Sequence, residues 1–151
     1  MAKRSYRRRP RNYKKTNILT KNFGSAGSQV MIATFAKQDA QMPGTWLNNV
    51  NVTAMLQEGD SDAGGMIFYL ATEAGTWDDD KCISAKGISG YGGSCSLAAK
   101  RKISINAEKE LGDFGQIYLW GEITDLSYTA DVEVRVVIET WGRNVLVVEN
   151  P

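Results

Sequence analysis

Residues 130–141, ADVEVRVVIETW, decide the fold class of this chain more clearly than any other stretch. Apolar and charged side chains alternate along them. One face carries Val132, Val134, Val136 and Ile138, and the other carries Glu133, Arg135 and Glu139. Successive side chains of a strand point to opposite sides of the backbone, so a period of two is typical of a strand with one buried face. The stretch therefore predicts a half-buried β-strand.

Similar patterns extend outward from this strand. Residues 46–56 alternate cleanly, with Val50, Val52, Ala54 and Leu56 on one face. Residues 66–72 are almost entirely apolar, as expected of a fully buried strand. Further strands are predicted at residues 17–23, 29–36, 81–86, 97–105 and 116–124. Residues 142–144 predict a turn that joins the strand at 130–141 to a strand at 145–149 as a hairpin. Eight or nine strands, with one helical turn at 106–111, predict an all-β sandwich or barrel.

Composition limits the functions that this chain can have. Its 151 residues suit one domain, and 42% hydrophobic residues can form a core without disulfides or metals. No apolar stretch approaches the roughly 18 residues that cross a bilayer, so we expect no membrane partner. The chain has no histidine. Because histidine is the commonest general base and a frequent zinc ligand, we expect no enzyme activity, no cofactor and no metal site.

The first fifteen residues, MAKRSYRRRPRNYKK, differ sharply from the rest. Their basic side chains are Lys3, Arg4, Arg7, Arg8, Arg9, Arg11, Lys14 and Lys15, and they include no acid. The chain has 18 basic and 17 acidic residues, so residues 16–151 keep 10 against 17, a charge of −7. Like charges do not pack into a core, and guanidinium groups bind phosphate through paired hydrogen bonds. We therefore predict a disordered or extended nucleic-acid-binding arm at 1–15 and one folded domain at 16–151.

Other features of the sequence support a nucleic-acid partner. Eight phosphate contacts would give a log–log salt dependence with a slope of roughly −6 on single strands. Tyr6 and Tyr13 lie among the charges and could stack on bases. No zinc-finger spacing or other base-reading module is present, so non-specific binding is expected. A second cluster, Lys100, Arg101 and Lys102, predicts a fixed extension of this surface, with a solvated strand edge or an ion pair between subunits as the alternative interpretations.

Two loop patterns have simpler interpretations than a ligand site. The acidic residues of the loops are Asp60, Asp62, Asp78, Asp79 and Asp80. They could hold calcium, but the segment similar to an EF-hand has Ala71 where a bidentate glutamate is required, so solvated loops are expected. Residues 87–96, GISGYGGSCS, match neither the dinucleotide-binding nor the P-loop pattern and predict a connection between strands.

The cysteines and tryptophans are interpreted as structural. Cys82 and Cys95 do not have the spacing of a metal site or a redox motif, so we expect two buried free thiols in a reducing compartment. The tryptophans are expected to fill the core or contacts between subunits. They are Trp46, Trp77, Trp120 and Trp141.

An arginine-rich arm on a compact all-β body of opposite charge resembles the single jelly-roll capsid proteins of small viruses. The opening MAKRSYRRRPRNYKK is most similar to the arms of capsid proteins from circular single-stranded DNA viruses, the circovirus-like group. The resemblance implies an eight-stranded antiparallel jelly-roll sandwich that self-assembles into an icosahedral shell of about 60 identical subunits, or a multiple. It further implies that the arm, from Lys3 to Lys15, contacts the packaged genome and serves as a nuclear localisation signal.

The resemblance also implies partners and a location. The partners are identical subunits and a single-stranded viral genome, DNA rather than RNA. The locations are the virion and, during assembly, the host nucleus. About 60 arms with eight positive charges each would supply on the order of 500 charges for the genome's phosphates.

Two other classes of protein remain as alternatives. A single-stranded nucleic-acid-binding barrel of the OB type, with a basic tail, would stack bases on sheet aromatics such as Tyr118 and Trp120. Such a barrel has about five strands, fewer than this sequence predicts. An enzyme on a jelly-roll scaffold, such as a cupin, generally needs histidines for its metal, and the chain has none.

Overall fold

The computed structural model describes residues 13–24, 29–39, 45–58, 65–72, 82–103, 116–124 and 132–149. These ranges form nine β-strands: β1 (Tyr13–Phe23), β2 (Val30–Lys37), β3 (Thr45–Glu58), β4 (Met66–Ala71), β5 (Cys82–Ile88), β6 (Ser94–Ile103), β7 (Ile117–Ile123), β8 (Val132–Arg143) and β9 (Val145–Glu149). Within them, no helix could span a membrane. The predicted all-β class is confirmed.

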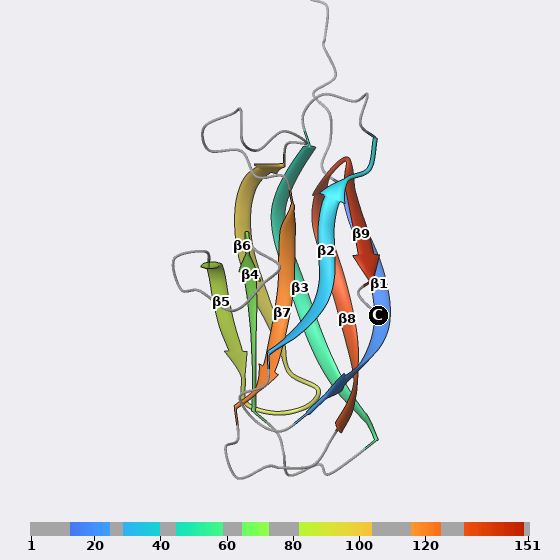
Figure 1. Cartoon of the computed structure of the whole chain (residues 1–151), viewed down its shortest axis with the longest axis vertical. Helices are drawn as coiled ribbons and strands as arrows, with labels where there is room; N and C mark the ends of the chain where they lie inside the picture. The colour runs from blue at the N-terminus through green and yellow to red at the C-terminus, as the bar shows by residue number, and fades with distance from the viewer. Residues whose placement is uncertain are drawn as a thin grey trace, which may run out of the picture.

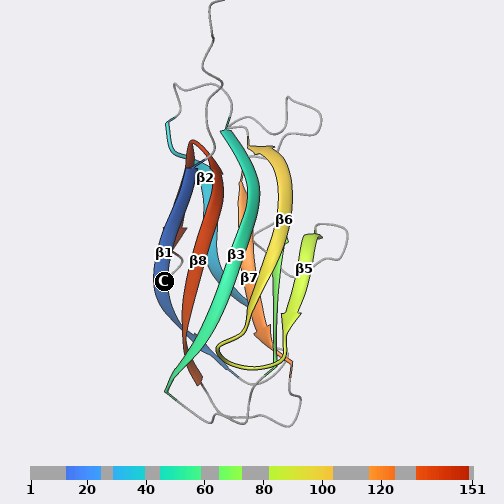
Figure 2. The same cartoon turned by 180° about the vertical axis from the view of Figure 1, so that it is seen from behind.

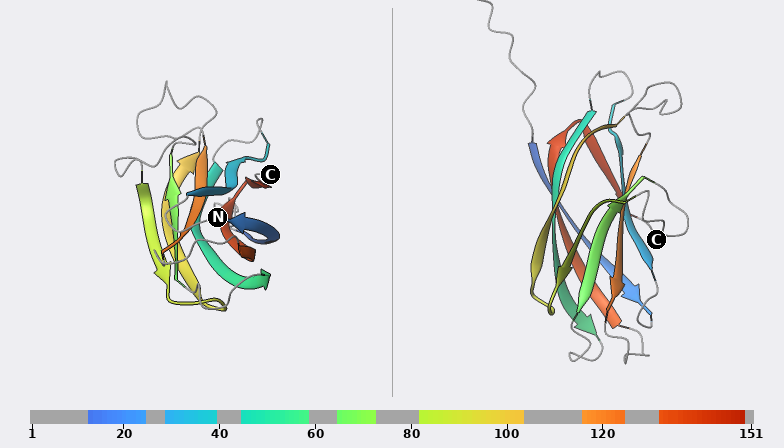
Figure 3. Two further views of the ribbon diagram at one scale, coloured as in Figure 1. Left: turned by 60° about the horizontal axis from the view of Figure 1, so that its bottom comes forward. Right: turned by 90° about the vertical axis from the view of Figure 1, so that its left-hand side faces the viewer.

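The strands form two antiparallel sheets that pack face to face (Figure 1 and Figure 3). One sheet has the order β1-β8-β3-β6, and the other has the order β5-β4-β7-β2-β9. The pairs β1–β8, β2–β7, β3–β6 and β4–β5 are those that form when one long antiparallel hairpin is rolled over itself. This is the jelly-roll topology, so the predicted eight-stranded jelly-roll sandwich is confirmed, with β9 as an additional edge strand.

The predicted hairpin at residues 142–149 is wrong. The chain leaves β8 after Arg143, and β9 pairs with β2 in the opposite sheet instead of returning along β8. The change of sheet occurs at Asn144, whose backbone has a φ of 57°. Asparagine tolerates this left-handed conformation better than most residues. The predicted turn is therefore present, but it directs the chain from one sheet to the other.

The side chain of Asn144 holds this corner together. Its Nδ2 donates to the backbone carbonyl of Asp39 at 3.2 Å and to Oγ1 of Thr45 at 3.0 Å. Its Oδ1 accepts from the backbone N–H of Asp39 at 3.1 Å, and its backbone carbonyl accepts from the N–H of Gln38 at 2.9 Å. Thr45 is fully buried. One residue thus connects the end of β2, the start of β3 and the bend between β8 and β9.

The core lies between the sheets and consists of the inward side chains of the strands. The alternation predicted for β8 is confirmed, and that for β3 is confirmed from Val50 to Ala54 but interrupted by a bulge between Leu47 and Asn49. The buried residues are Val50, Val52, Ala54, Val132, Val134, Val136 and Ile138. The side chains of β2 do not alternate regularly, because Ile32, Ala33 and Phe35 are all buried. A bulge between Met31 and Ala33 shifts the register by one residue, and alternation alone does not reveal such a shift.

The glycine-rich segment is a connection, as predicted, although a shorter one. β5 extends to Ile88 and β6 begins at Ser94, which leaves residues 89–93 between them. The N–H of Gly92 donates to the carbonyl of Ala54 at 2.6 Å, and Gly92 has a φ of 87°, a conformation that favours glycine. Contacts with β3 therefore fix this loop.

Several predicted features lie outside the described residues. They are residues 1–12, the helical turn at 106–111, Trp77, and the aspartates Asp60, Asp62, Asp78, Asp79 and Asp80. Both cysteines are free thiols, but each is only partly buried. Burial raises the pKa of the Cys95 thiol and outweighs the opposing effect of Lys86, so this thiol stays protonated at neutral pH.

Candidate nucleic-acid interface

The structure describes five of the eleven residues predicted to bind nucleic acid. Those that lie outside the described ranges are Lys3, Arg4, Arg7, Arg8, Arg9 and Arg11. Lys14 and Lys15 were predicted to belong to the arm, but β1 already begins at Tyr13, so both lie in the folded sheet. Lys100, Arg101 and Lys102 lie near the end of β6, as part of the same four-stranded sheet.

Lys14 and Lys15 point to opposite sides of β1. The ammonium of Lys14 lies on the outer face of the four-stranded sheet and forms an ion pair with Glu139 of β8, with 2.8 Å between Nζ and Oε2. Lys15 donates to the carbonyl of Val145 at 2.9 Å and to Oε1 of Gln38. Lys15 thus joins β1 to the opposite sheet, and only Lys14 is directed toward the outer face.

The basic cluster of β6 is shaped by a bulge. Asn49 of β3 is paired with Ala98, but Leu47 is paired with Arg101, so β6 contains one extra residue between these pairs. Lys100 occupies the bulge and has a φ of 46°. The guanidinium of Arg101 turns back on its own strand and donates to the carbonyl of Ala99 at 3.1 Å. The three residues therefore do not form one flat basic row, although all are exposed.

The sheet brings a further basic residue to the same end. Arg143 is paired with Trp46, and Trp46 is paired with Lys102, so these three residues form a row across β8, β3 and β6. The next outward row consists of Lys14, Trp141 and Asn49. Sequence reasoning missed Arg143 because it stands in a predicted turn, far from the other basic residues in the chain. Figure 2 shows the four strands of this face side by side.

A shallow groove crosses the outer face beside these rows. One hollow, with a volume of about 170 Å³, is lined by Lys14, Asn49, Asn51, Glu139 and Trp141. A second hollow, of about 310 Å³, is lined by Asn51, Thr53, Ser94, Cys95, Ser96 and Glu139. Because the two hollows share two lining residues, they form one depression that runs from β1 to β6. We call it the Trp141 groove.

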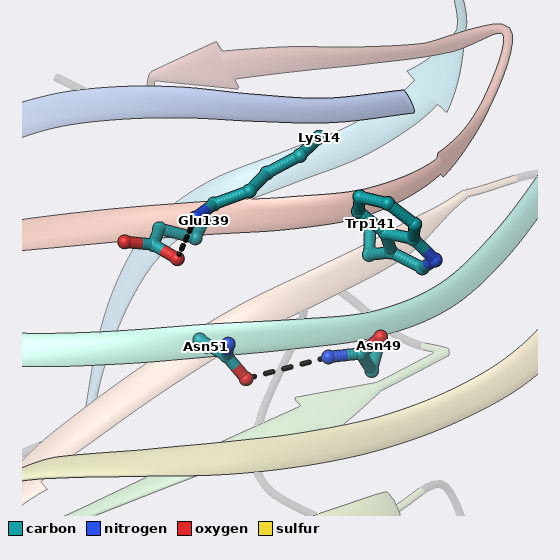
Figure 4. A pocket seen from close by; sticks show the side chains of 5 residues that line it. All are labelled: Lys14, Asn49, Asn51, Glu139 and Trp141. Atoms are coloured by element: carbon teal, nitrogen blue, oxygen red, sulfur yellow. Dashed lines mark hydrogen bonds and ion pairs between the residues drawn. The ribbon is translucent and has the colours of Figure 1, made fainter. Parts of the chain in front are cut away.

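The groove combines one large aromatic surface with several hydrogen-bonding groups. Trp141 is 40% exposed, a large fraction for a tryptophan. Nδ2 of Asn49 donates to Oδ1 of Asn51 at 3.3 Å. Figure 4 shows Trp141 beside Asn49, with the Lys14–Glu139 pair and Asn51 further along the groove. Trp141 was predicted to fill the core or a subunit contact, and its exposure excludes the core.

The sequence did not lead to a prediction of the groove residues, although the alternation along two strands indicated that several of them face outward. Trp141 has the same parity as Glu139 along β8, and Glu139 was correctly predicted to face outward. Asn49 and Asn51 likewise alternate along their strand with Val50 and Val52, which were predicted to share one face. The pairing of β3 with β8 is what brings the two sets together, and strand partners are not encoded in the local pattern.

The outer face of the five-stranded sheet has a different character. Tyr69 and Trp120 are buried there and stack with ring centroids 6.3 Å apart and an interplanar angle of 4°. Their apolar neighbours include Met31, Ile67, Cys82 and Tyr118. Glu122 lies in the same sheet, and burial raises the pKa of its carboxyl. Tyr118 and Trp120, the residues named for an OB-type barrel, therefore belong to a packed cluster.

Some solved structures follow a backbone path similar to that of this chain. No protein-family model and no curated protein sequence matches the chain. A chain of the cyanophage Pam1 capsid asymmetric unit has a TM-score of 0.43 and 11% identity, over 87% of this chain and 86% of that one. A chain of the naturally occurring empty particles of cowpea mosaic virus has a TM-score of 0.45 and 11% identity, over 92% and 88%.

The similar structures are not all viral. A chain from the disulfide-linked pili of Bacillus endospore appendages has a TM-score of 0.35 and 10% identity, over 86% of this chain and 89% of that one. Likenesses of this degree concern the path of the chain.

Proposed function

We propose that this protein is a viral capsid protein that assembles into a closed icosahedral shell and packages single-stranded nucleic acid through its basic N-terminal arm. One observation carries the proposal. The end of the jelly roll at which residues 1–12 join β1 also carries Lys14, Lys100, Lys102 and Arg143. The fixed cations thus lie near the point from which the arm departs.

The fold and the composition narrow the class of protein. Double-sheet jelly rolls occur in viral capsid proteins, lectins and cupins. A cupin usually holds its metal with histidines, and this chain has none. An OB-type barrel is excluded by the two sheets of four and five strands. Among the remaining classes, a polyanion packaged inside a shell gives the clearest role to a stretch of eight basic residues without an acid.

The charge distribution favours many weakly binding arms over one tight site. Residues 16–151 carry a charge of −7 and would repel a polyanion, so the arm must supply the attraction. If many arms are held within one shell, each bound strand is retained by several contacts at once. The predicted genome is single-stranded DNA, the predicted assembly site is the host nucleus, and the predicted shell contains about 60 subunits or a multiple. The role is structural and not enzymatic.

Electron microscopy of the purified chain, with absorbance at 260 and 280 nm on the same sample, tests the proposal. We expect uniform closed particles with a nucleic-acid excess. The decisive variant replaces the six basic residues of positions 1–12 by glutamine and leaves β1 intact. It should form particles without the absorbance excess, and the salt-dependence slope for single strands should fall by roughly 4.

The control variant replaces Lys37 and Lys86 by glutamine. Both residues belong to the five-stranded sheet, so particle formation and nucleic-acid content should stay unchanged. Monomers or small oligomers under all conditions would contradict the shell. Particles with unchanged nucleic-acid content after neutralisation of the arm would contradict packaging by the arm.

A further inference from the structure

We infer that the Trp141 groove binds a base of single-stranded nucleic acid by stacking it on the indole ring. The inference rests on the proposed function and adds a base contact from the folded sheet to the phosphate contacts of the arm's basic side chains. Its starting point is the exposed fraction of Trp141, 40%, on the outer face of a folded sheet. The same residue type is 9% exposed at Trp120 on the opposite face.

The walls of the groove suit a planar heterocycle. Trp141 supplies an aromatic surface, and aromatic surfaces bind any base because every base has a π-face. Its cross-strand partner Asn49 presents an amide group beside the ring, and Asn51 presents a second amide further along the hollow (Figure 4). Amides can donate to and accept from the edge of a base. The hollow of about 170 Å³ is small for a drug-sized ligand, since such pockets measure about 300–1,000 Å³, so it suits a single ring system.

The donors and acceptors of the groove are only partly used by the protein. Within the described residues, Asn49 donates to Asn51, and Lys14 is paired with Glu139. Neither contact engages Nδ2 of Asn51, which keeps two N–H groups for a base edge. The ammonium of Lys14 is 51% exposed as a side chain and can contact a phosphate while it stays near Glu139.

The position of the groove favours a nucleotide over a sugar. A tryptophan next to amides and a carboxylate could also hold a saccharide, by stacking and by hydrogen bonds to hydroxyl groups. Here, however, Lys14 lies in the groove, and Arg143 and Lys102 occupy the adjacent row. Tyr13, the first described residue, is paired with Gly142, directly beside Trp141. A strand held by the arm is therefore kept at high local concentration next to the indole.

The test is a comparison of two polyanions on full-length chains purified as dissociated subunits. Oligo(dT) presents bases and phosphates, and inorganic polyphosphate presents phosphates alone. Binding is measured at several salt concentrations for the wild type, Trp141→Ala, Trp141→Phe and a control, Met55→Ala. Met55 is an exposed apolar residue on β3 of the same sheet, 43% exposed and outside the groove.

We expect Trp141→Ala to weaken oligo(dT) binding roughly 5- to 150-fold, with the salt-dependence slope unchanged, because stacking releases no counterion. Trp141→Phe should restore most of the affinity, and Met55→Ala should bind as the wild type does. Polyphosphate should bind all four chains equally. In the wild type, oligo(dT) should also quench a part of the tryptophan fluorescence that Trp141→Phe lacks.

Other outcomes would overturn the inference in distinguishable ways. Equal oligo(dT) binding by wild type and Trp141→Ala would overturn the base contact and leave packaging by the arm intact. An equal loss for both polyanions would show that Trp141 acts only on the structure. Quenching of Trp141 by a free saccharide, with none by oligo(dT), would make the groove a glycan site. A wild type that binds neither polyanion would overturn the proposed function and the base contact together.

Discussion

The two outward faces of the sandwich are both formed by antiparallel strands, but their side chains are packed differently. The face of β1, β8, β3 and β6 carries a groove with amides, an ion pair and an exposed tryptophan. The face of the five-stranded sheet carries a packed cluster around the stacked Tyr69–Trp120 pair. On the first face the indole of Trp141 is exposed, whereas on the second the indole of Trp120 is buried by packing. The comparison teaches that the residue type does not reveal its role until its neighbours across the strands are known.

The largest effect is expected from replacing the buried tryptophan. Trp120→Ala should lower the free energy of unfolding by about 3 kcal/mol or more, because it leaves a cavity and removes the stacking partner of Tyr69. Trp141→Ala should lower it by less than about 1 kcal/mol, since that ring is 40% exposed. Urea unfolding of both variants measures the difference. Equal losses would mean that the two faces are packed alike.

The next effect concerns the corner that brings β9 to the five-stranded sheet. Asn144→Ala should cost about 1–3 kcal/mol, because Thr45 and Asp39 lose their hydrogen bonds to its side chain and a residue with positive φ loses asparagine's tolerance. Asn144→Gly separates the two causes, since it relieves the backbone but not the lost bonds. The urea unfolding midpoints of the wild type, Asn144→Ala and Asn144→Gly measure the two contributions. Unchanged stability in both variants would show that the corner does not depend on this side chain.

A smaller effect is expected from the ion pair on the grooved face. Lys14→Met should change the free energy of unfolding by only about 0.2–1 kcal/mol, because both side chains are more than one third exposed. The same substitution should weaken single-strand binding and reduce the salt-dependence slope by roughly 0.7. Oligonucleotide titrations over a range of salt concentrations measure that slope. An unchanged slope would mean that Lys14 contacts no phosphate.

The smallest effect is a pH dependence on the apolar face. Burial raises the pKa of Glu122 in the folded chain, so the folded state holds its proton more tightly than the unfolded state does. Stability should therefore decrease as pH rises from the ordinary value of 4.5 through the folded pKa, and remain lower above it. Glu122→Gln should remove this decrease and raise the melting temperature slightly at pH 7. Thermal melts from pH 4 to 8 test the sign, and a Gln variant that melts lower at pH 7 would contradict it.

Much of the fold was predictable because alternation is a local property. Residues 132–138 showed their inward and outward faces directly, and the buried strand β4 showed an apolar run. The bulge in β2 and the destination of β9 were not predictable, because each depends on a partner strand far away in the chain. The positive charge of the basic segments was predictable, because it depends only on residue type. The sequence did not show that Lys15 would be used to join the two sheets.

By itself, the sequence determined the all-β class, the strands and the concentration of positive charge at the start of the chain. The class and the strands follow from side-chain periodicity, and the positive charge follows from the residue types themselves. Neither requires knowledge of contacts between distant residues. Only the tertiary structure decided which strands are neighbours, and therefore that Trp120 is packed and Trp141 is exposed beside Asn49. The physical reason is that a residue's surroundings in the sandwich come from strands up to 130 positions away, as in the hydrogen bond from Lys15 to the carbonyl of Val145.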